Sequence, residues 1–135
     1  MRWTTSSPEE TEAAGAEFAP ELSPGDVVLV SGELGSGKTT FIRGACRELG
    51  VTEPVTSPTF TIGQLHRGRV EVAHLDLYRL PSLAGEDPAL LDDYLTAERV
   101  GFVEWPGAAE PAIPRPRARV RLEHMGGDRR RITVE

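Results

Sequence analysis

The stretch that decides the fold spans residues 27–49 and has the sequence VVLVSGELGSGKTTFIRGACREL. Its first four residues, Val27 to Val30, form a short apolar run between turn signals, which is typical of a strand buried on both faces. Residues 39–49 carry apolar side chains on one helical face, and the pattern stops at Gly50, which predicts a helix over that range. A buried strand, a glycine-rich loop and an amphipathic helix in this order indicate an α/β fold.

The loop between this strand and this helix matches the motif G-x-x-x-x-G-K-[ST] at Gly32, Gly37, Lys38 and Thr39. Glycines let the backbone fold tightly around phosphate oxygens, and the N-terminus of the following helix adds partial positive charge. In such a P-loop the lysine reaches the β- and γ-phosphates and the threonine hydroxyl binds Mg²⁺. By chance the motif would occur in roughly one in a thousand chains of this composition. The residues predicted to bind the nucleotide are Gly32, Glu33, Leu34, Gly35, Ser36, Gly37, Lys38, Thr39 and Thr40.

Lys38 is the only lysine among the 15 basic residues of the chain; all the others are arginine. A bias toward arginine that stops at one position indicates that a compact ammonium is needed there and that a planar guanidinium does not fit. We therefore expect Lys38 to act directly on the bound phosphates.

Two acids follow apolar strand patterns. Asp76 ends a strand predicted over residues 69–77, and Glu104 ends one predicted over residues 100–104. Carboxylates at the carboxyl ends of strands lie at the edge of the sheet where α/β proteins bind ligands. Asp76 is expected to bind Mg²⁺, and Glu104 to position the attacking water or a metal-bound one. The alternative for each is an acid that merely ends a strand at the surface.

The rest of the chain predicts a small set of further elements. Ser7-Pro8-Glu9-Glu10 is a capping box that opens a helix reaching residue 18 or 19. A β-hairpin is predicted from residues 59–65 and 69–77 around a turn at 66–68, and a terminal hairpin around Gly126-Gly127-Asp128. A short helix is predicted from Asp87-Pro88 to residue 95, and the proline-rich segment 106–116 is expected to be a connector.

Composition bounds the class of protein. The chain has 135 residues, a net charge of −6 and one cysteine, Cys46. This length predicts a single domain over residues 1–135, and one cysteine excludes an intramolecular disulfide. No apolar stretch has the length of a membrane span or a signal peptide, so we expect a cytoplasmic protein without membrane contact.

Several other residues have weaker signals. His66, His74 and His124 lack metal-like spacing and are expected to be structural or at the surface. Cys46 lies on the apolar face of the helix and is expected to belong to the core. Residues 117, 119 and 121 form an arginine stripe on one face of a predicted strand. That stripe is either solvated or faces an acidic protein or the phosphate backbone of an RNA.

On these motifs the chain resembles the TsaE (YjeE) family, P-loop ATPases required for threonylcarbamoyladenosine formation on tRNA. The resemblance implies a P-loop NTPase-like three-layer fold with a mixed parallel and antiparallel central sheet. It also implies Mg²⁺ held at Thr39 and Asp76, a catalytic role for Glu104, and a switch-like segment with Thr59 beneath the γ-phosphate. Without the resemblance, the alternative is that Thr59 only begins a strand, which its β-branched side chain favours. The segments that carry the resemblance are residues 25–26, 32–41, 56–60, 74–80, 93–95 and 104–106.

The function implied is an ATP-binding and hydrolysing accessory protein of tRNA t6A modification. It would use ATP or ADP and Mg²⁺, act with the TsaB–TsaD complex, and touch tRNA only indirectly or weakly. Catalysis would fall to Lys38, Glu104 and Thr59, and metal binding to Thr39, Asp76 and Glu104. One alternative is a small P-loop kinase acting on a small molecule, for which the chain has little length left to form a substrate lid. Another is a nucleotide-sensing adaptor without turnover.

Overall fold

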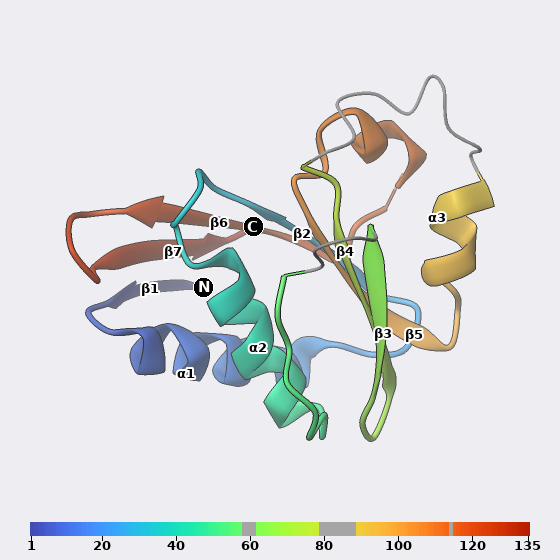
Figure 1. Ribbon diagram of the computed structural model, residues 1–135, viewed down its shortest axis with the longest axis horizontal. Helices are drawn as coiled ribbons and strands as arrows, with labels where there is room; N and C mark the ends of the chain where they lie inside the picture. Colours follow the sequence, from blue (N-terminus) through green and yellow to red (C-terminus); the bar gives the residue numbers. More distant parts are fainter. Residues whose placement is uncertain (58–61, 79–88, 114) are drawn as a thin grey trace.

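A seven-stranded sheet runs through the computed structural model, which describes residues 1–57, 62–78, 89–113 and 115–135. The strands lie in the order β1-β7-β6-β2-β5-β4-β3 (Figure 1). β2 is parallel to both of its neighbours, β5 and β6, and β4 is parallel to β5, whereas the other three pairs are antiparallel. The predicted mixed sheet is confirmed. The strands span Arg2–Thr5 (β1), Val27–Ser31 (β2), Gly63–Arg67 (β3), Glu71–Asp76 (β4), Arg99–Glu104 (β5), Ala118–His124 (β6) and Arg130–Val134 (β7).

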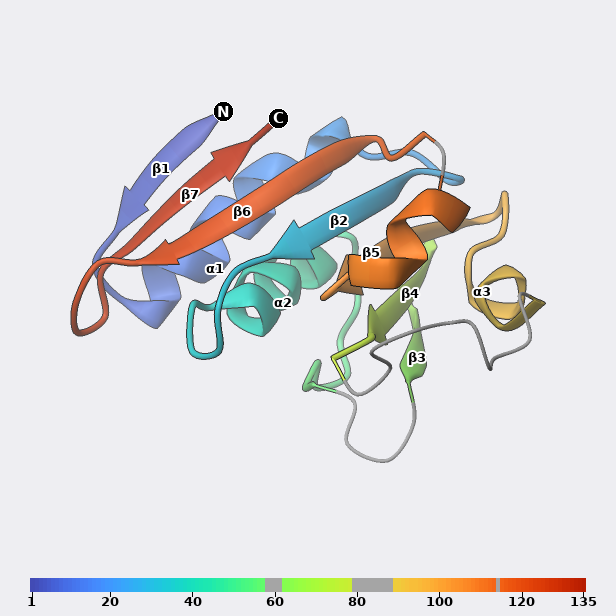
Figure 2. The same ribbon diagram turned by 90° about the horizontal axis from the view of Figure 1, so that it is seen from above.

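Helices cover both faces of this sheet, which gives three layers (Figure 2). On one face α1 (Pro8–Phe18) and α2 (Lys38–Glu48) pack over a core that includes Phe18, Phe41 and Phe102. On the other face α3 (Ala89–Tyr94) contributes Leu91, and Ile113, just after the 3₁₀ helix η2 (Gly107–Ala112), joins the same smaller core. A short 3₁₀ helix, η1 (Ala19–Glu21), follows α1.

The two helices on the first face approach each other closely. A Cβ at Gly15 would overlap the backbone of Phe41, and one at Gly44 would overlap the backbone of Glu12. Glycine at both positions therefore sets how deeply α1 and α2 pack together. The Ser7 cap is confirmed, because the Glu10 amide donates to Ser7 Oγ at 3.1 Å. Cys46 is a core residue, as predicted, and burial raises the pKa of its thiol to about 12.

Three points of the predicted secondary structure need correction: a missing strand, the position of a turn, and a segment expected to be a connector. β1 was not predicted, because Arg2–Thr5 is too short to show a clear alternation; all four of its residues pair with β7 at the edge of the sheet. The turn of the first hairpin lies at 68–70 rather than 66–68. Gly68 packs against the backbone of Leu49, and the Arg69 amide donates to the Leu49 carbonyl at 2.8 Å, so a contact with the end of α2 fixes the turn. The segment expected to be a connector forms η2 over part of its length.

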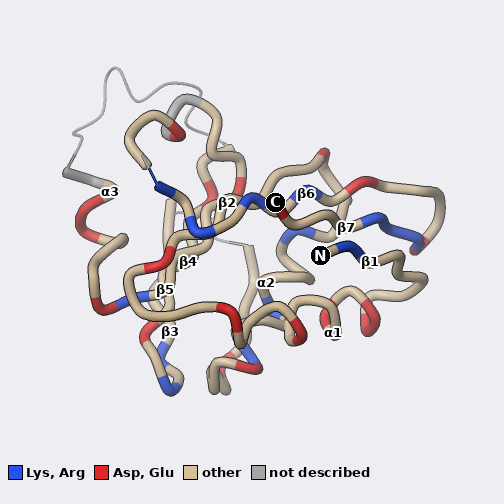
Figure 3. The backbone as a smooth tube through the Cα atoms, turned by 180° about the vertical axis from the view of Figure 1, so that it is seen from behind, with Lys and Arg blue, Asp and Glu red and all other residues tan. Residues whose placement is uncertain are grey.

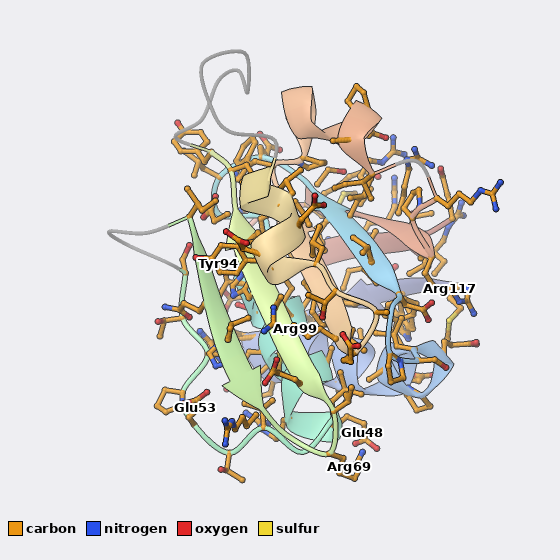
Figure 4. The ribbon with its side chains drawn as sticks, turned by 90° about the vertical axis from the view of Figure 1, so that its right-hand side faces the viewer. Glu48, Glu53, Arg69, Tyr94, Arg99 and Arg117 are labelled. Carbon is orange, nitrogen blue, oxygen red and sulfur yellow. The ribbon has the colours of Figure 1, made fainter. Side chains whose placement is uncertain are left out.

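Two predicted starts, residues 59–61 of the first hairpin and residues 87–88 of the short helix, lie outside the described residues. The described part of that helix is anchored by Arg99 on β5. The Arg99 guanidinium donates to the carbonyls of Asp93 and Tyr94 and pairs with Glu71 on β4 (Figure 4). The helix is therefore fixed at its carboxyl end, where a cation is favourable.

The arginine stripe is exposed along β6, as the alternation predicted (Figure 3). Arg119 pairs with Glu110 at 2.6 Å, Arg121 lies 3.8 Å from Glu123, and Arg117, which precedes β6, lies 3.8 Å from Asp26. Exposed pairs of this kind contribute little stability. None of the helices in the described part of the chain is long and apolar enough to cross a membrane.

Candidate functional site

The loop between β2 and α2 closes around the Lys38 side chain. Lys38 Nζ donates to the carbonyls of Gly32 at 2.7 Å and Glu33 at 3.0 Å. Gly37 has a φ of 96°, a left-handed conformation that favours glycine, and α2 begins directly after it. The predicted strand, loop and helix are thus confirmed, with the helix starting one residue earlier than expected.

The ammonium of Lys38 is withdrawn from water. The residue is 5 % exposed, and its Nζ lies 4.2 Å from the ring centroid of Trp105. Burial lowers the pKa of Lys38 below its usual value, while the charges of Glu104, Asp76 and Glu33 oppose that shift. A desolvated cation beside a glycine-rich loop attracts phosphate strongly, because few water contacts must be given up.

The two acids lie at different distances from the loop. Glu104 ends β5, which pairs with β2, and Thr39 Oγ1 donates to its carboxylate at 3.0 Å. Asp76 ends β4, one strand farther from β2, and accepts hydrogen bonds from Ser57 Oγ at 2.9 Å and from the Tyr78 amide at 3.0 Å. Both carboxylates lie at the carboxyl ends of parallel strands, as predicted, but only Glu104 is bonded to the P-loop helix.

His74 contacts the site although no role there was predicted for it. It is fully buried on β4, and its Nε2 donates to Glu104 Oε2 at 2.5 Å. Its Nδ1 is buried and has no partner among the described residues. Its burial agrees with the expectation of a structural histidine, and its hydrogen bond to Glu104 adds a contact with an acid of the site that was not predicted. The signal available was a polar residue within an otherwise apolar strand, two positions before Asp76.

Trp105 forms another wall of the site, and Tyr78 packs against it. The rings of Trp105 and Tyr78 lie 4.9 Å apart, and Trp105 has a φ of 54°, rare for a residue with a side chain. This strained conformation directs the indole over Lys38 rather than into the core. Strain of this kind is concentrated at functional sites.

These groups surround a hollow of about 310 Å³. Its walls come from the P-loop, from Ser57, Asp76 and Glu104, and from Trp105 and Arg130. The residues predicted for the site that line this hollow are Leu34, Gly35, Gly37, Lys38, Thr39, Thr40, Asp76 and Glu104. The other predicted loop residues, Gly32, Glu33 and Ser36, do not line it. Thr59 lies outside the described residues. Arg130 was not predicted, because it follows the loop by 95 positions and carries no motif.

The oxygen atoms in the site are of the kind that could bind a magnesium ion together with phosphate. Mg²⁺ prefers oxygen ligands and is usually held by one or two side chains, with water and phosphate oxygens completing the shell. The Thr39 hydroxyl and the Glu104 carboxylate, 3.0 Å apart, supply such a pair. Among the described residues no cluster of three His, Cys, Asp or Glu side chains is present that would hold an ion by itself. Phosphate is thus a natural partner of any ion bound here.

Comparison with known proteins shows relatives in both sequence and overall structure. Similar proteins include the tRNA threonylcarbamoyladenosine biosynthesis protein TsaE of Bacillus subtilis, 40% identical over 134 residues, covering 98% of this chain and 84% of the relative. The Treponema pallidum protein of the same name is 32% identical over 134 residues, covering 99% of both chains. The crystal structure of Bacillus subtilis YdiB superposes with a TM-score of 0.81 at 36% identity, covering 99% of this chain and 83% of that one. Residues 5–132 match the family described as threonylcarbamoyl adenosine biosynthesis protein TsaE, and the chain therefore belongs to the TsaE family.

Proposed function

We propose that this protein binds and hydrolyses ATP in the presence of Mg²⁺ as an accessory protein of tRNA t6A modification, acting with the TsaB–TsaD complex. The observation that carries the proposal is the contact of Lys38, Thr39 and Glu104 around one glycine-rich loop. Family membership supports the pathway. The choice of ATP rather than GTP as the nucleotide rests on the family resemblance alone.

Each side chain has a task in this proposal. Lys38 would exchange the carbonyls of Gly32 and Glu33 for the β- and γ-phosphate oxygens, since the phosphate charge outweighs two neutral acceptors. A bound Mg²⁺ would neutralise charge that develops between the β- and γ-phosphates. Thr39 and Glu104 would hold that ion.

Asp76 remains a candidate for the metal, directly or through water. Its hydrogen bonds to Ser57 and to the Tyr78 amide keep the carboxylate at the edge of the hollow, one strand away from Thr39. Because Glu104 and not Asp76 contacts Thr39, the proposal exchanges the roles expected from the sequence: Glu104 holds the ion with Thr39, and Asp76 orients the attacking water. Thr59 is kept as a candidate for the same region.

The decisive experiment measures steady-state ATP hydrolysis by the protein alone and mixed with TsaB and TsaD. We expect slow hydrolysis alone and faster hydrolysis in the mixture, because P-loop ATPases and GTPases often gain rate when a partner completes the site. A mixture that binds but does not accelerate hydrolysis would refute the accessory role. Phosphoryl transfer to a member of a metabolite panel would instead support the small-molecule kinase.

His74 supplies a prediction about positioning. His74→Leu removes the N–H donor to Glu104, and we expect turnover to fall by about tenfold to a hundredfold with a raised Mg²⁺ requirement, the usual cost of losing a group that orients a metal ligand. His74→Gln keeps an N–H near the position of Nε2 and should restore most of the loss. Magnesium titrations of both variants measure this. Equal behaviour of the two variants would show that His74 only fills space.

A further inference from the structure

The segment of residues 51–57 follows α2 and runs between α2 and β3 (Figure 1). Its first part is anchored in the larger core, where Val51 and Val55 are buried. The Val51 amide also donates to the Cys46 carbonyl of α2 at 3.0 Å. At the other end of the segment Ser57 lines the hollow over the P-loop. The segment therefore connects the core beside α2 with the nucleotide site.

Side chains from two neighbouring elements hold the middle of this segment. Arg43 of α2 donates through Nε to the Val55 carbonyl at 2.9 Å. His66 of β3 donates through Nδ1 to the Glu53 carboxylate at 2.7 Å. Two residues of chain span at most about 7 Å, so the position of Ser57 is limited while Val55 is held. The helix that follows the P-loop thus helps to place Ser57.

Ser57 is one of two donors that hold the Asp76 carboxylate. The Ser57 hydroxyl donates to Oδ2 at 2.9 Å, and the Tyr78 amide donates to Oδ1 at 3.0 Å. A carboxylate oxygen accepts about two hydrogen bonds, so each oxygen keeps one acceptor position free. Because both oxygens are held, rotation of the carboxylate is restricted, and its free positions are fixed relative to the hollow that Ser57 and Asp76 both line.

Asp76 lies near the place that the terminal phosphate would take. Burial lowers the pKa of Lys38, and the charge of Asp76 is among those that oppose this shift. Lys38 is the residue expected to reach the β- and γ-phosphates. No ion pair joins Lys38 to Asp76 in the described part of the chain, so the carboxylate is not taken up by the lysine. A carboxylate that orients a water must itself be oriented, and its rotation would reduce rate more than affinity.

We propose that Ser57 is a positioning residue for Asp76, and that Arg43 acts through Ser57 by holding the segment that presents its hydroxyl. This inference rests on the proposed function, because it assumes that Asp76 orients the attacking water. The helix α2 then serves the site twice. Its first turn binds the phosphates and the ion, and Arg43, farther along, fixes the acid that orients the water.

The first test measures kcat, the KM for ATP and the Mg²⁺ requirement of the protein mixed with TsaB and TsaD. Ser57→Ala removes the hydroxyl, and Ser57→Thr keeps it. Pro58 follows in the sequence and restricts residue 57 to extended backbone, which threonine also favours. The control Thr52→Ala removes an exposed hydroxyl from the same segment. Thermal unfolding checks that each variant is folded.

We expect Ser57→Ala to lower kcat about fivefold to tenfold, near the lower end of the usual cost of losing an orienting partner, because water can replace an exposed hydroxyl. KM and the Mg²⁺ requirement should stay within about twofold of the wild type, since the hydroxyl acts through Asp76 alone. Ser57→Thr should restore kcat, and Thr52→Ala should behave like the wild type.

Three outcomes would overturn the role of Ser57. Unchanged kcat in Ser57→Ala would show that the Tyr78 amide alone orients the carboxylate. A raised KM or Mg²⁺ requirement would make Ser57 a ligand of the phosphate or the ion. A Ser57→Thr protein as slow as Ser57→Ala would show that the hydroxyl is not what matters. A wild-type mixture without ATP turnover would refute the proposed function itself, whereas normal turnover that no Ser57 variant changes would refute this inference alone.

The second test concerns Arg43. Arg43→Met removes the donor to Val55, and Arg47→Met is its matched control. Arg47 lies one turn farther along α2 and also pairs with Glu12, but in the described structure it forms no hydrogen bond with residues 51–57. We expect Arg43→Met to lower kcat about threefold and the double variant with Ser57→Ala to be no slower than Ser57→Ala alone, because both changes act through one hydroxyl. Losses that multiply in the double variant, or a wild-type kcat in Arg43→Met, would overturn the role of Arg43.

Discussion

Replacing Glu104 with glutamine is expected to lower ATP turnover by about 10²-fold or more and to raise the Mg²⁺ concentration needed for half-maximal rate. Glutamine has nearly the same shape but carries no charge. Its amide oxygen can take the place of Oε2, which accepts from Thr39 and His74, but its amide nitrogen is a donor and cannot act as a metal ligand or as the second acceptor for Thr39. ATP affinity measured without Mg²⁺ should change little, because the phosphate contacts come from the loop. Single-turnover hydrolysis over a magnesium titration measures both effects.

Two comparisons make this result specific to the site. Glu98→Gln changes an exposed acid just before β5 and should leave turnover and Mg²⁺ dependence as they are. Asp76→Asn should lower turnover with a smaller change in the Mg²⁺ requirement, since Asp76 bonds to Ser57 and not to Thr39. A Glu104→Gln protein with wild-type turnover and Mg²⁺ dependence would show that Glu104 is only an acid at a strand end.

The P-loop, the strand before it and the helix after it were predictable because their signals are local. Val27 to Val30, the glycines and the apolar face of α2 all lie within one continuous segment. The acids were predictable for a related reason, since each ends a strand pattern and the ends of parallel strands meet at one edge. The contacts that these two acids make were not predictable. Whether Glu104 or Asp76 touches Thr39 depends on which strand neighbours β2, and spacing along the chain does not encode that order.

The contacts of His74 and Arg130 could not be predicted for the same reason: each joins residues that are far apart in the sequence. His74 reaches Glu104 across two parallel strands, 30 positions apart in sequence, and Arg130 reaches Gly35 across 95 positions. Neither contact leaves a periodicity or a motif in a single sequence. β1 was missed for a related reason: its residues include strand-favouring tryptophan and threonine, but four residues are too few to show a clear alternation, and its pairing with β7 joins the two ends of the chain.

The second large effect concerns Lys38. Lys38→Ala is expected to weaken ATP binding by about 10²-fold, because it removes the cation that the loop directs at the phosphates. Lys38→Met has similar length and no charge, so it separates loss of charge from loss of packing and should bind as poorly as Lys38→Ala. Calorimetry with ATP and Mg²⁺ measures the affinities, and thermal unfolding confirms that the variants are folded.

Lys38→Arg is the more informative substitution, because it keeps the charge. Lys38 is 5 % exposed, and its ammonium bonds to two loop carbonyls at 2.7 and 3.0 Å and lies against the Trp105 ring. A guanidinium is wider and would have to displace the loop or the indole, whose backbone is already in a strained conformation. We therefore expect ATP hydrolysis to fall at least tenfold while the helix survives, since lysine and arginine have similar helix propensities. Full hydrolysis by Lys38→Arg would mean that the single lysine of the chain reflects no need for an ammonium at this position.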